Sequence, residues 1–360
     1  MYRALTDEQS FLQQAAAEAL ARHKTVEAAR EALDEPSAYP SLWPVAVEAG
    51  WTGLLIGEDA DGVGLGAYEA LLILEACGSR LADARLLGHL PATALLEAAG
   101  ADSGLRSALA SGDRRAALVC PSAGDRPGAV TATVDGDAAV LDGGVTGVLD
   151  ADGADVLVVL GRDADGAAVL SVIDTGADGV TVSGKAAYDS TRALADVAFS
   201  GARATALTLP ADVPATTGRD LQRALLAAES VGAVDGCLTM ATEYAKDRVA
   251  FGRPIGSYQA IKHKLVEMLR LSEGARSLLV ASGNAWGDSD FGLLANAART
   301  AAADALDYSA PENIFIHGGV GATWEHDAML YYRRAESSRR LAGGADAAAA
   351  AVADALLAAA

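Results

Sequence analysis

Residues 248–259 read Arg248-Val-Ala-Phe251-Gly252-Arg-Pro254-Ile255-Gly256-Ser-Tyr-Gln259, and residues 317–325 read His317-Gly318-Gly319-Val-Gly321-Ala-Thr-Trp324-Glu325. The first segment joins two stretches that each predict a long helix, Asp220–Phe251 and Gln259–Trp286. The glycine motif of the second segment is weak evidence by itself. In combination and at this spacing, the two segments are specific for one scaffold.

The composition is that of an acidic globular protein with more than one core. A chain of 360 residues has ample length for this. Apolar residues make up 51% of it, yet no run reaches the ~20 uncharged apolar residues that span a bilayer. The first residues include acids where a secretory signal would have an apolar core, so we expect a cytoplasmic protein.

The formal net charge of −20 argues against nucleic acid or an anionic membrane surface as a partner. Because coenzyme A and flavin dinucleotides are themselves anions, a ligand of that kind would need a local basic site.

No metal site is predicted. The three cysteines (Cys77, Cys120 and Cys237) form no CxxC pair, and His317 and His326 have no third ligand at metal spacing.

The sequence predicts three successive zones: helical over residues 1–112, β-rich over 113–205 and helical over 206–360. Thr6 and Gln9 form a capping box before a helical apolar pattern. Residues Pro91–Ala99 predict a helix with proline in its first turn, where it is tolerated. In the last zone, further helices are predicted at Gly292–Ser309 and Gly343–Ala360.

Short β-rich runs separated by Gly and Asp turns predict an antiparallel sheet or barrel in the middle zone. The runs are Ala116–Cys120, Ala129–Val134, Ala138–Leu141, Val156–Leu160, Ala168–Ile173 and Val197–Phe199.

Over nearly its whole length the chain resembles the acyl-CoA dehydrogenase family. The resemblance is carried by the two opening segments and by Glu325, Arg333, Trp43, Ala49-Gly50-Trp51 and Gly62-Val-Gly64-Leu-Gly66. It implies an α+β fold with an N-terminal α-helical domain (1–112), a β-barrel-like middle domain (113–205) and a C-terminal four-helix bundle (206–360). In the family this bundle drives assembly into tetramers.

The resemblance also implies a flavin reaction on an acyl-CoA thioester. A carboxylate removes the α proton, hydrogen-bond donors stabilise the thioester oxygen, and the β hydrogen passes to FAD. Family members take this carboxylate from a glutamate in one of two places, the loop before the last helix or the first helix of the bundle. The matching residues here are Ala342 and Gln222, and neither can abstract a proton.

The family's own-subunit flavin contacts are replaced as well. Its Thr-Glu-Pro-Gly-Ala-Gly-Ser-Asp loop is matched by the residues from Val119 to Arg126, with valine for the threonine and an aspartate for the phosphate-binding serine. Its Trp-Ile-Thr-Asn-Gly element is matched by Gly147-Val148-Leu149-Asp150-Ala151, which lacks the aromatic wall and the hydroxyl.

In this family, other residues reach the flavin of a neighbouring subunit, and more of these residues are present in this sequence. Arg248 matches an arginine that pairs with the pyrophosphate, and Phe251 and Gln259 match residues near the adenosine. One departure is Phe315, which stands where the family has a glutamine. The cofactor-binding residues predicted from the resemblance are Arg248, Phe251, Gln259, His317, Gly318, Gly319 and Gly321.

Three hypotheses follow. The first, which we favour, is a non-catalytic subunit in a heterotetramer with a catalytic acyl-CoA dehydrogenase homologue. It resembles the subunits of actinobacterial steroid side-chain enzymes that end in a stretch like Leu341-Ala-Gly343-Gly344. The second is a self-sufficient homo-oligomeric enzyme with a displaced base, Glu229 or Asp220. The third is a flavin-free scaffold or acyl-thioester-binding protein. The acyl group, whether steroid, fatty or biosynthetic, and its carrier, coenzyme A or a carrier protein, stay open.

Overall fold

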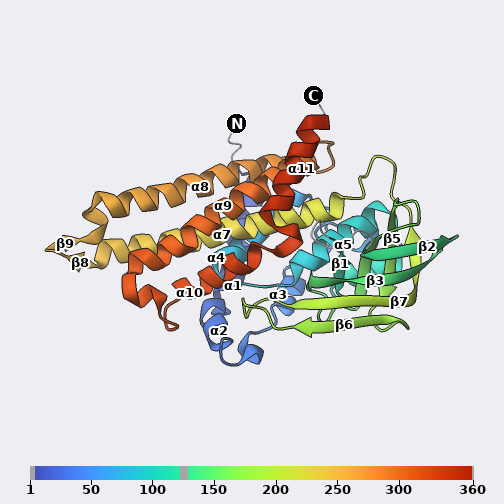
Figure 1. The fold of residues 1–360 in the computed structure, drawn as a ribbon, viewed down its shortest axis with the longest axis horizontal. Helices are drawn as coiled ribbons and strands as arrows, with labels where there is room; N and C mark the ends of the chain where they lie inside the picture. Colours follow the sequence, from blue (N-terminus) through green and yellow to red (C-terminus); the bar gives the residue numbers. More distant parts are fainter. Residues whose placement is uncertain (1–4, 122–128, 359–360) are drawn as a thin grey trace.

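The computed structural model describes residues 5–121 and 129–358, and it places a helical body beside a β sheet (Figure 1). The N-terminal helices and the long C-terminal helices pack together, and the sheet lies at one end of this body. The tip formed by β8 and β9 lies at the opposite end (Figure 1).

The N-terminal region contains six α-helices among its described residues. They are α1 (Asp7–Ala21), α2 (Thr25–Glu31), α3 (Trp43–Glu48), α4 (Ala67–Ser79), α5 (Leu86–Ala98) and α6 (Ser103–Ala110). The predicted capping box is confirmed, because the Gln9 N–H donates to Thr6 Oγ1 and the Thr6 N–H donates to Gln9 Oε1, both at 3.1 Å.

Helices α4 and α7 (Thr217–Asp247) cross so closely that glycine is required on both. A Cβ atom at Gly78 would lie 1.9 Å from the Glu229 carbonyl oxygen, and one at Gly232 would lie 1.9 Å from the Glu75 carbonyl oxygen. The backbones touch at this crossing, which fixes the N-terminal helices against the C-terminal bundle.

The prediction that a helix starts at Pro91 is wrong. Helix α5 begins at Leu86, after Arg85 in the left-handed conformation, and Pro91 lies inside it. Proline has no N–H to donate to the carbonyl four residues earlier, which is that of Leu87. Gln222 of α7 takes the place of that donor, with its Nε2 at 3.0 Å from the Leu87 oxygen. A side chain 135 residues away in the sequence therefore donates the hydrogen bond that the Leu87 carbonyl lacks inside the helix.

The described residues of the middle zone form one seven-stranded sheet. Pairings β4–β2, β2–β3, β3–β7, β7–β5 and β5–β4 close a ring, which agrees with the predicted barrel-like architecture, while β1 and β6 add to β4 and β7. The strands are β1 (Ala116–Val119), β2 (Val130–Asp135), β3 (Ala138–Leu149), β4 (Val156–Arg162), β5 (Ala168–Asp174), β6 (Val180–Lys185) and β7 (Leu194–Leu207).

Several features of the sheet differ from the prediction. Strand β1 runs parallel to β4, whereas the runs predicted antiparallel pairing. Strand β6 was not predicted because its apolar alternation is short: only Val180 and Val182 are partly buried, and the strand ends in Ser, Gly and Lys. Strand β7 extends far beyond the predicted Val197–Phe199 because it pairs with β3, β5 and β6.

The C-terminal region is a helical bundle whose fourth position is filled by two consecutive helices. Its members are α7, α8 (Gln259–Asn284), α9 (Phe291–His317), α10 (Ala328–Ser338) and α11 (Gly344–Ala358). Helix α7 ends at Asp247 rather than Phe251, because the two-residue strands β8 (Val249–Ala250) and β9 (Arg253–Pro254) turn the chain through Phe251 and Gly252, both at positive φ. Helix α9 continues past the predicted Ser309 to His317, with Pro311 inside it.

Among residues 5–121 and 129–358, two helical stretches could cross a membrane by length and composition alone: α7 and Leu341–Ala358. In α7 the apolar window is 72% buried inside the protein, which makes it a core helix. Helix α11 has 15 residues, a length of about 22 Å at 1.5 Å per residue. That is shorter than the ~30 Å of a bilayer core, and the helix also contains Asp346 and Asp354.

The Pro91–Leu87–Gln222 contact predicts a stability effect that depends on its context. We expect Gln222→Leu to cost about 1–3 kcal/mol, because it leaves the Leu87 carbonyl without a donor in a buried site. In a Pro91→Ala background the helix regains its own N–H donor, so the same substitution should cost clearly less. Urea unfolding of the four proteins measures the difference, and an equal cost in both backgrounds would contradict this explanation.

Candidate functional site

A pocket of about 420 Å³ lies between the sheet, helix α7 and the turn that separates α10 from α11. Gln222 and Ala342, the two residues matched to the family's base positions, both line it. The structure therefore brings together two positions that were found independently by counting from different motifs. Gly147, Val148 and Leu149, matched to the family's flavin-wall element, line the same pocket.

No carboxylate lines this pocket within residues 5–121 and 129–358. Ala342 offers only a methyl group, and the Gln222 amide is held by its bond to Leu87. Gly147 has no side chain to cover a flavin ring where the family has tryptophan. These residues do not fit a complete flavin and base arrangement. Of the other matched flavin element, residues 122–126 lie outside the described part of the chain.

The turn that carries Ala342 is firmly held although it presents no base. Ala342 itself is left-handed, with φ 53°, and Gly343 and Gly344 also have positive φ. Arg223 of α7 donates from Nε to the Ala342 carbonyl at 3.0 Å. Arg299 of α9, fully buried, donates to the Ser338 carbonyl at the end of α10. The partial negative charge of a helix C-terminus favours such a cation.

Asp220, one candidate for a displaced base, supports this turn indirectly. Its Oδ1 accepts a hydrogen bond from Asn296 Nδ2 at 2.9 Å. The Asn296 Oδ1 in turn accepts from Arg223 Nη1 at 2.6 Å. Asp220 is buried and does not line the pocket, so the structure gives it a supporting contact rather than access to a substrate.

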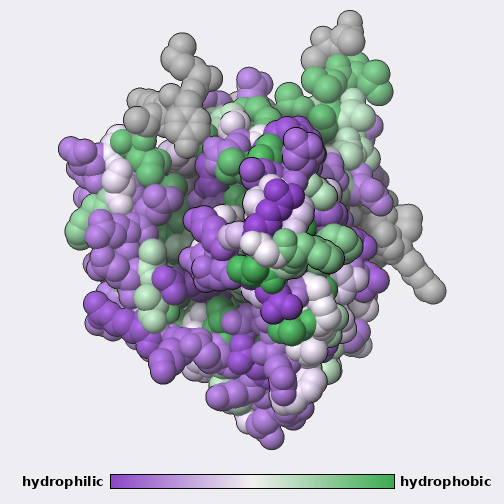
Figure 2. All heavy atoms as spheres, turned by 90° about the vertical axis from the view of Figure 1, so that its left-hand side faces the viewer, coloured by the Kyte–Doolittle hydropathy of each residue, from purple (hydrophilic) through white to green (hydrophobic). Residues whose placement is uncertain are grey.

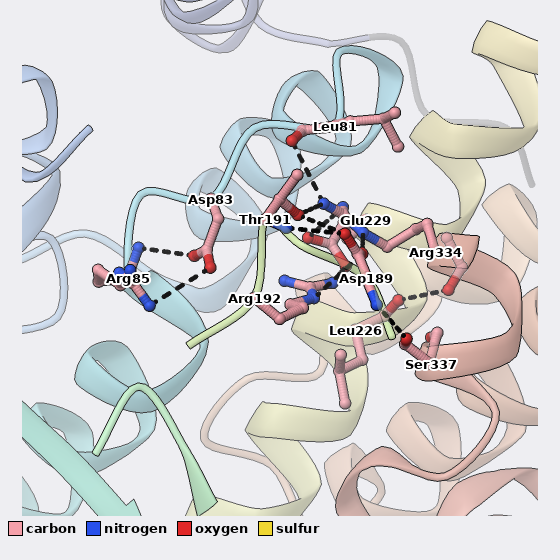
Figure 3. A network of polar contacts seen from close by, with 12 residues as sticks. Leu81, Asp83, Arg85, Asp189, Thr191, Arg192, Leu226, Glu229, Arg334 and Ser337 are labelled. Carbon is pink, nitrogen blue, oxygen red and sulfur yellow. Dashed lines mark hydrogen bonds and ion pairs between the residues drawn. The ribbon is translucent and has the colours of Figure 1, made fainter. Parts of the chain in front are cut away.

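Glu229, the other candidate, belongs to a buried ion network (Figure 3). Its carboxylate pairs with Arg192 and with Arg334, the latter at 3.0 Å. Glu229 lies on the same face of α7 as Gln222, but seven residues along a helix are about 10 Å along its axis. That distance places it in the network and away from the pocket lining.

Asp189 completes the network between the strands and the bundle. It accepts hydrogen bonds from Arg334 and from Thr191 Oγ1 (Figure 3). Burial opposes ionisation of Asp189, but Arg334 and Arg192 outweigh it and hold the pKa of this carboxyl below its usual value. The Asp189 N–H also donates to Ser337 Oγ, and Ser337 lines the pocket.

Asp150, which follows the pocket residue Leu149, is a further buried carboxyl group. Its Oδ2 accepts the Gly88 N–H at 2.7 Å, in the first turn of α5. Burial, reinforced by the Asp83 carboxylate, raises the pKa of Asp150 to about 7, although Arg85 and the Gly88 N–H oppose the shift. Between about pH 4 and pH 7, the folded protein therefore keeps a proton on Asp150 that the unfolded chain has released.

The residues matched to the trans flavin contacts lie at the far tip of the bundle, in and around the hairpin β8–β9 (Figure 1). Phe251 is 98% exposed, and Arg248 and Gln259 are also exposed. Arg253 stacks over the Tyr258 ring at 4.1 Å. Figure 2 looks onto this end of the molecule, where hydrophilic residues surround scattered hydrophobic groups.

This tip is basic although the molecule is strongly acidic. Residues 246–264 contain a single acid, Asp247. They contain five basic residues, namely Lys246, Arg248, Arg253, Lys262 and Lys264. Lys264 pairs with Glu312. The local positive charge that an anionic coenzyme would require is therefore present at the tip.

His317 differs from the other matched residues because its side chain faces inward. It is 4% exposed, its Nδ1–H donates to the Asn313 carbonyl at 2.8 Å, and its ring packs against Tyr244 and His326. Gly318 and Gly319 are exposed, whereas Gly321 is buried. The side chain of His317 thus anchors the glycine segment, and only the backbone after it reaches the surface.

Sequence reasoning did not identify the polar residues that line the rest of the pocket. These are Thr146, Lys185, Tyr188, Ser337 and Arg340. They belong to no motif and come from three segments that are far apart in the sequence, so only the folded structure brings them together.

The raised pKa of Asp150 predicts a pH-dependent gain from removing its charge. Stability that depends on the bound proton is present below about pH 4 and is lost as the pH rises through the folded pKa near 7. Asp150→Asn keeps an acceptor for the Gly88 N–H and removes the charge. We expect its Tm to exceed that of the wild type by a few degrees at pH 8, with a smaller difference at pH 5.

Thermal unfolding at the two pH values measures this effect. Asp165→Asn, at an exposed position in the β4–β5 turn, is the matched control and should show no such pH dependence. A gain of equal size at pH 5 and pH 8 would show that the Asp150 charge is not its cause.

Comparisons with known proteins agree with the geometry. A family model described as the acyl-CoA dehydrogenase N-terminal domain matches residues 6–103, and one described as the acyl-CoA dehydrogenase C-terminal domain matches residues 215–357. The acyl-CoA dehydrogenase IpdE2 of Mycobacterium tuberculosis is 32% identical over 335 residues, which cover 92% of each chain. IpdE2 of Mycolicibacterium smegmatis is 33% identical, with coverage of 93% of this chain and 94% of the relative.

Solved structures show the same fold. One described as the Tcur3481-Tcur3483 steroid ACAD G363A variant aligns with a TM-score of 0.87 and 27% identity over 98% of this chain and 99% of the other. The ChsE4-ChsE5 complex from Mycobacterium tuberculosis aligns with a TM-score of 0.87 at 24% identity, covering 99% of both chains. With relatives above 30% identity over nine-tenths of its length, and with both terminal domains matched, the chain belongs to the acyl-CoA dehydrogenase family.

Proposed function

We propose that this chain is the non-catalytic subunit of a cytoplasmic, FAD-dependent acyl-CoA dehydrogenase, paired with a catalytic homologue in a heterotetramer. The observation that carries the proposal is the pocket. The pocket is lined by the two positions that match the family's base positions. One holds the Gln222 amide, which is hydrogen-bonded to the Leu87 carbonyl, and the other holds only the methyl group of Ala342. The two candidates for a displaced base, Glu229 and Asp220, are occupied in buried contacts elsewhere.

The basic tip supports a contribution to the partner's cofactor. Bound FAD would accept the hydride in the partner's site. Arg248 is exposed, and its guanidinium is suited to a charge-assisted bond with a pyrophosphate oxygen. Phe251 and Gln259 belong to the same exposed segment and would contact the adenosine end, and the exposed backbone at Gly318 and Gly319 would close the site. The carboxylate that removes the α proton would come from the partner.

The relatives also support a partner of the same family. The structures described as Tcur3481-Tcur3483 steroid ACAD and as the ChsE4-ChsE5 complex each name two components. The first is a steroid enzyme by its description, so a steroid acyl thioester is the substrate class that we propose to test first. A fatty acyl or biosynthetic thioester is the alternative.

Expression of the chain alone and together with its partner tests the proposal. We expect the chain alone to be colourless and inactive, because its own pocket lacks the flavin wall and the base. The co-expressed complex should carry FAD and desaturate an acyl-CoA. A yellow, active homomer would overturn the proposal in favour of a self-sufficient enzyme. A colourless protein that never binds a homologue would favour a flavin-free thioester-binding protein.

Arg248 provides a sharper test within the complex. Arg248→Met should weaken FAD binding by about tenfold or more, because a hydrogen bond to a charged group contributes about 1.5–3 kcal/mol. Arg270→Met is the matched control, since Arg270 is an exposed arginine of α8 that pairs with Glu267 of its own helix. Titration of FAD into the apo complex measures both, and equal affinities would rule out a trans contact from Arg248.

A further inference from the structure

The orientation of the Gln222 amide determines what this chain's own pocket can recognise. A carbonyl oxygen only accepts hydrogen bonds, so the group that faces Leu87 must be the amide NH₂. Its Oε1 therefore points elsewhere. Among the described residues, no donor forms a hydrogen bond with this oxygen. The oxygen is also not one of their buried polar atoms without a partner, which means that it is accessible from outside the protein. Since Gln222 lines the pocket, Oε1 is its acceptor toward a bound molecule.

The charges on the pocket wall favour an anion. Lys185 and Arg340 line it, and no carboxylate does so within the described ranges. Lys185 is paired with Asp196 at 2.9 Å. Arg340 is exposed, and no acid pairs with it in the part of the chain that the structure describes. In a protein of net charge −20, an uncompensated cation at the pocket mouth is a local attraction for a negative group.

The remaining wall is apolar and built partly from small residues. Val145, Leu194 and Leu341 contribute branched side chains, while Ala342 and Gly343 leave room near Gln222. A ligand that satisfies all three regions has an apolar body, an anionic end and a hydrogen-bond donor opposite the amide oxygen. An amide oxygen is not basic enough to remove a proton, so such a ligand would be held without being converted.

We propose that this pocket binds an acyl-CoA thioester that carries a hydroxyl group on C2 or C3 of the acyl chain, and that Gln222 Oε1 accepts the hydrogen bond of that hydroxyl. The thioester class and the position of the hydroxyl rest on the proposed function, because residue 222 stands where the family holds its base over the α carbon. The phosphates of coenzyme A are the anionic end that Arg340 and Lys185 attract. The site is one of recognition, distinct in chemistry from the catalytic site that we assign to the partner.

Calorimetric titration of the purified full chain, without partner or flavin, tests this proposal. The probes are octanoyl-CoA, 2-hydroxyoctanoyl-CoA and 3-hydroxyoctanoyl-CoA. At least one hydroxylated thioester should bind about fivefold more tightly than octanoyl-CoA, the ratio expected for one neutral hydrogen bond. Equal affinities for all three, or no binding at about 1 mM, a Kd that corresponds to about −4 kcal/mol, would overturn the proposal.

Variants assign the contacts. In Gln222→Met the preference for a hydroxyl should vanish, and its persistence would overturn the proposal. Arg340→Met leaves the amide contacts untouched and should weaken all three thioesters by the same factor. Its matched control is Arg339→Met, because Arg339 pairs with Asp307 and does not line the pocket. Unequal factors among the thioesters in Arg340→Met, or an effect of the same size in Arg339→Met, would contradict the assignment of the anionic end.

The outcome is separable from that of the proposed function. Binding to the isolated chain requires no flavin, so a failure here leaves the FAD content and activity of the co-expressed complex unaffected. Conversely, a complex without FAD would overturn the subunit proposal, but it would not change the thioester affinities measured on the isolated chain.

Discussion

The buried ion network of Asp189, Arg192, Glu229 and Arg334 is the interaction on which the arrangement of the three regions depends (Figure 3). It joins the connection between β6 and β7 to α7 and α10, and Arg334 reaches the Leu81 carbonyl of the N-terminal region. Removing one partner of such a buried set costs about 3–5 kcal/mol, because the charges that remain are desolvated and unpaired. Other residues of these same segments, among them Tyr188, Gln222 and Ser337, line the pocket, so the network holds together the elements that form its walls.

The sequence predicted the fold because the fold rests on local patterns. The two glycine-containing segments align the sequence with the family. Counting from Gly252 and Gly319 then leads to Gln222 and Ala342 as the matches of the family's base positions, and the structure places both in one pocket. The start of α5 was missed because the donor that permits Pro91 inside a helix comes from α7. No local pattern can carry that information.

Other misassignments have the same origin. Periodicity placed Glu229 on the face of α7 that carries Gln222, which is right, but it gave no account of distance along the helix or of Arg192 and Arg334, which neutralise its charge. Likewise, His317 belongs to the glycine motif in sequence, yet its ring is enclosed by Tyr244 and His326. Burial and pairing across elements decided both cases, and a single sequence shows neither.

The bond between Gln222 and Leu87 limits which side chains position 222 can accept. While Pro91 remains in α5, a glutamate at position 222 would place a carboxylate against a carbonyl oxygen, and two acceptors repel unless the acid stays protonated. Gln222→Glu alone would therefore set two acceptors against each other, whereas a prior Pro91→Ala change would give the Leu87 carbonyl a donor from its own helix. Position 342 has no such lock, because its turn is held through backbone carbonyls. A carboxylate introduced at position 342 would meet no such conflict.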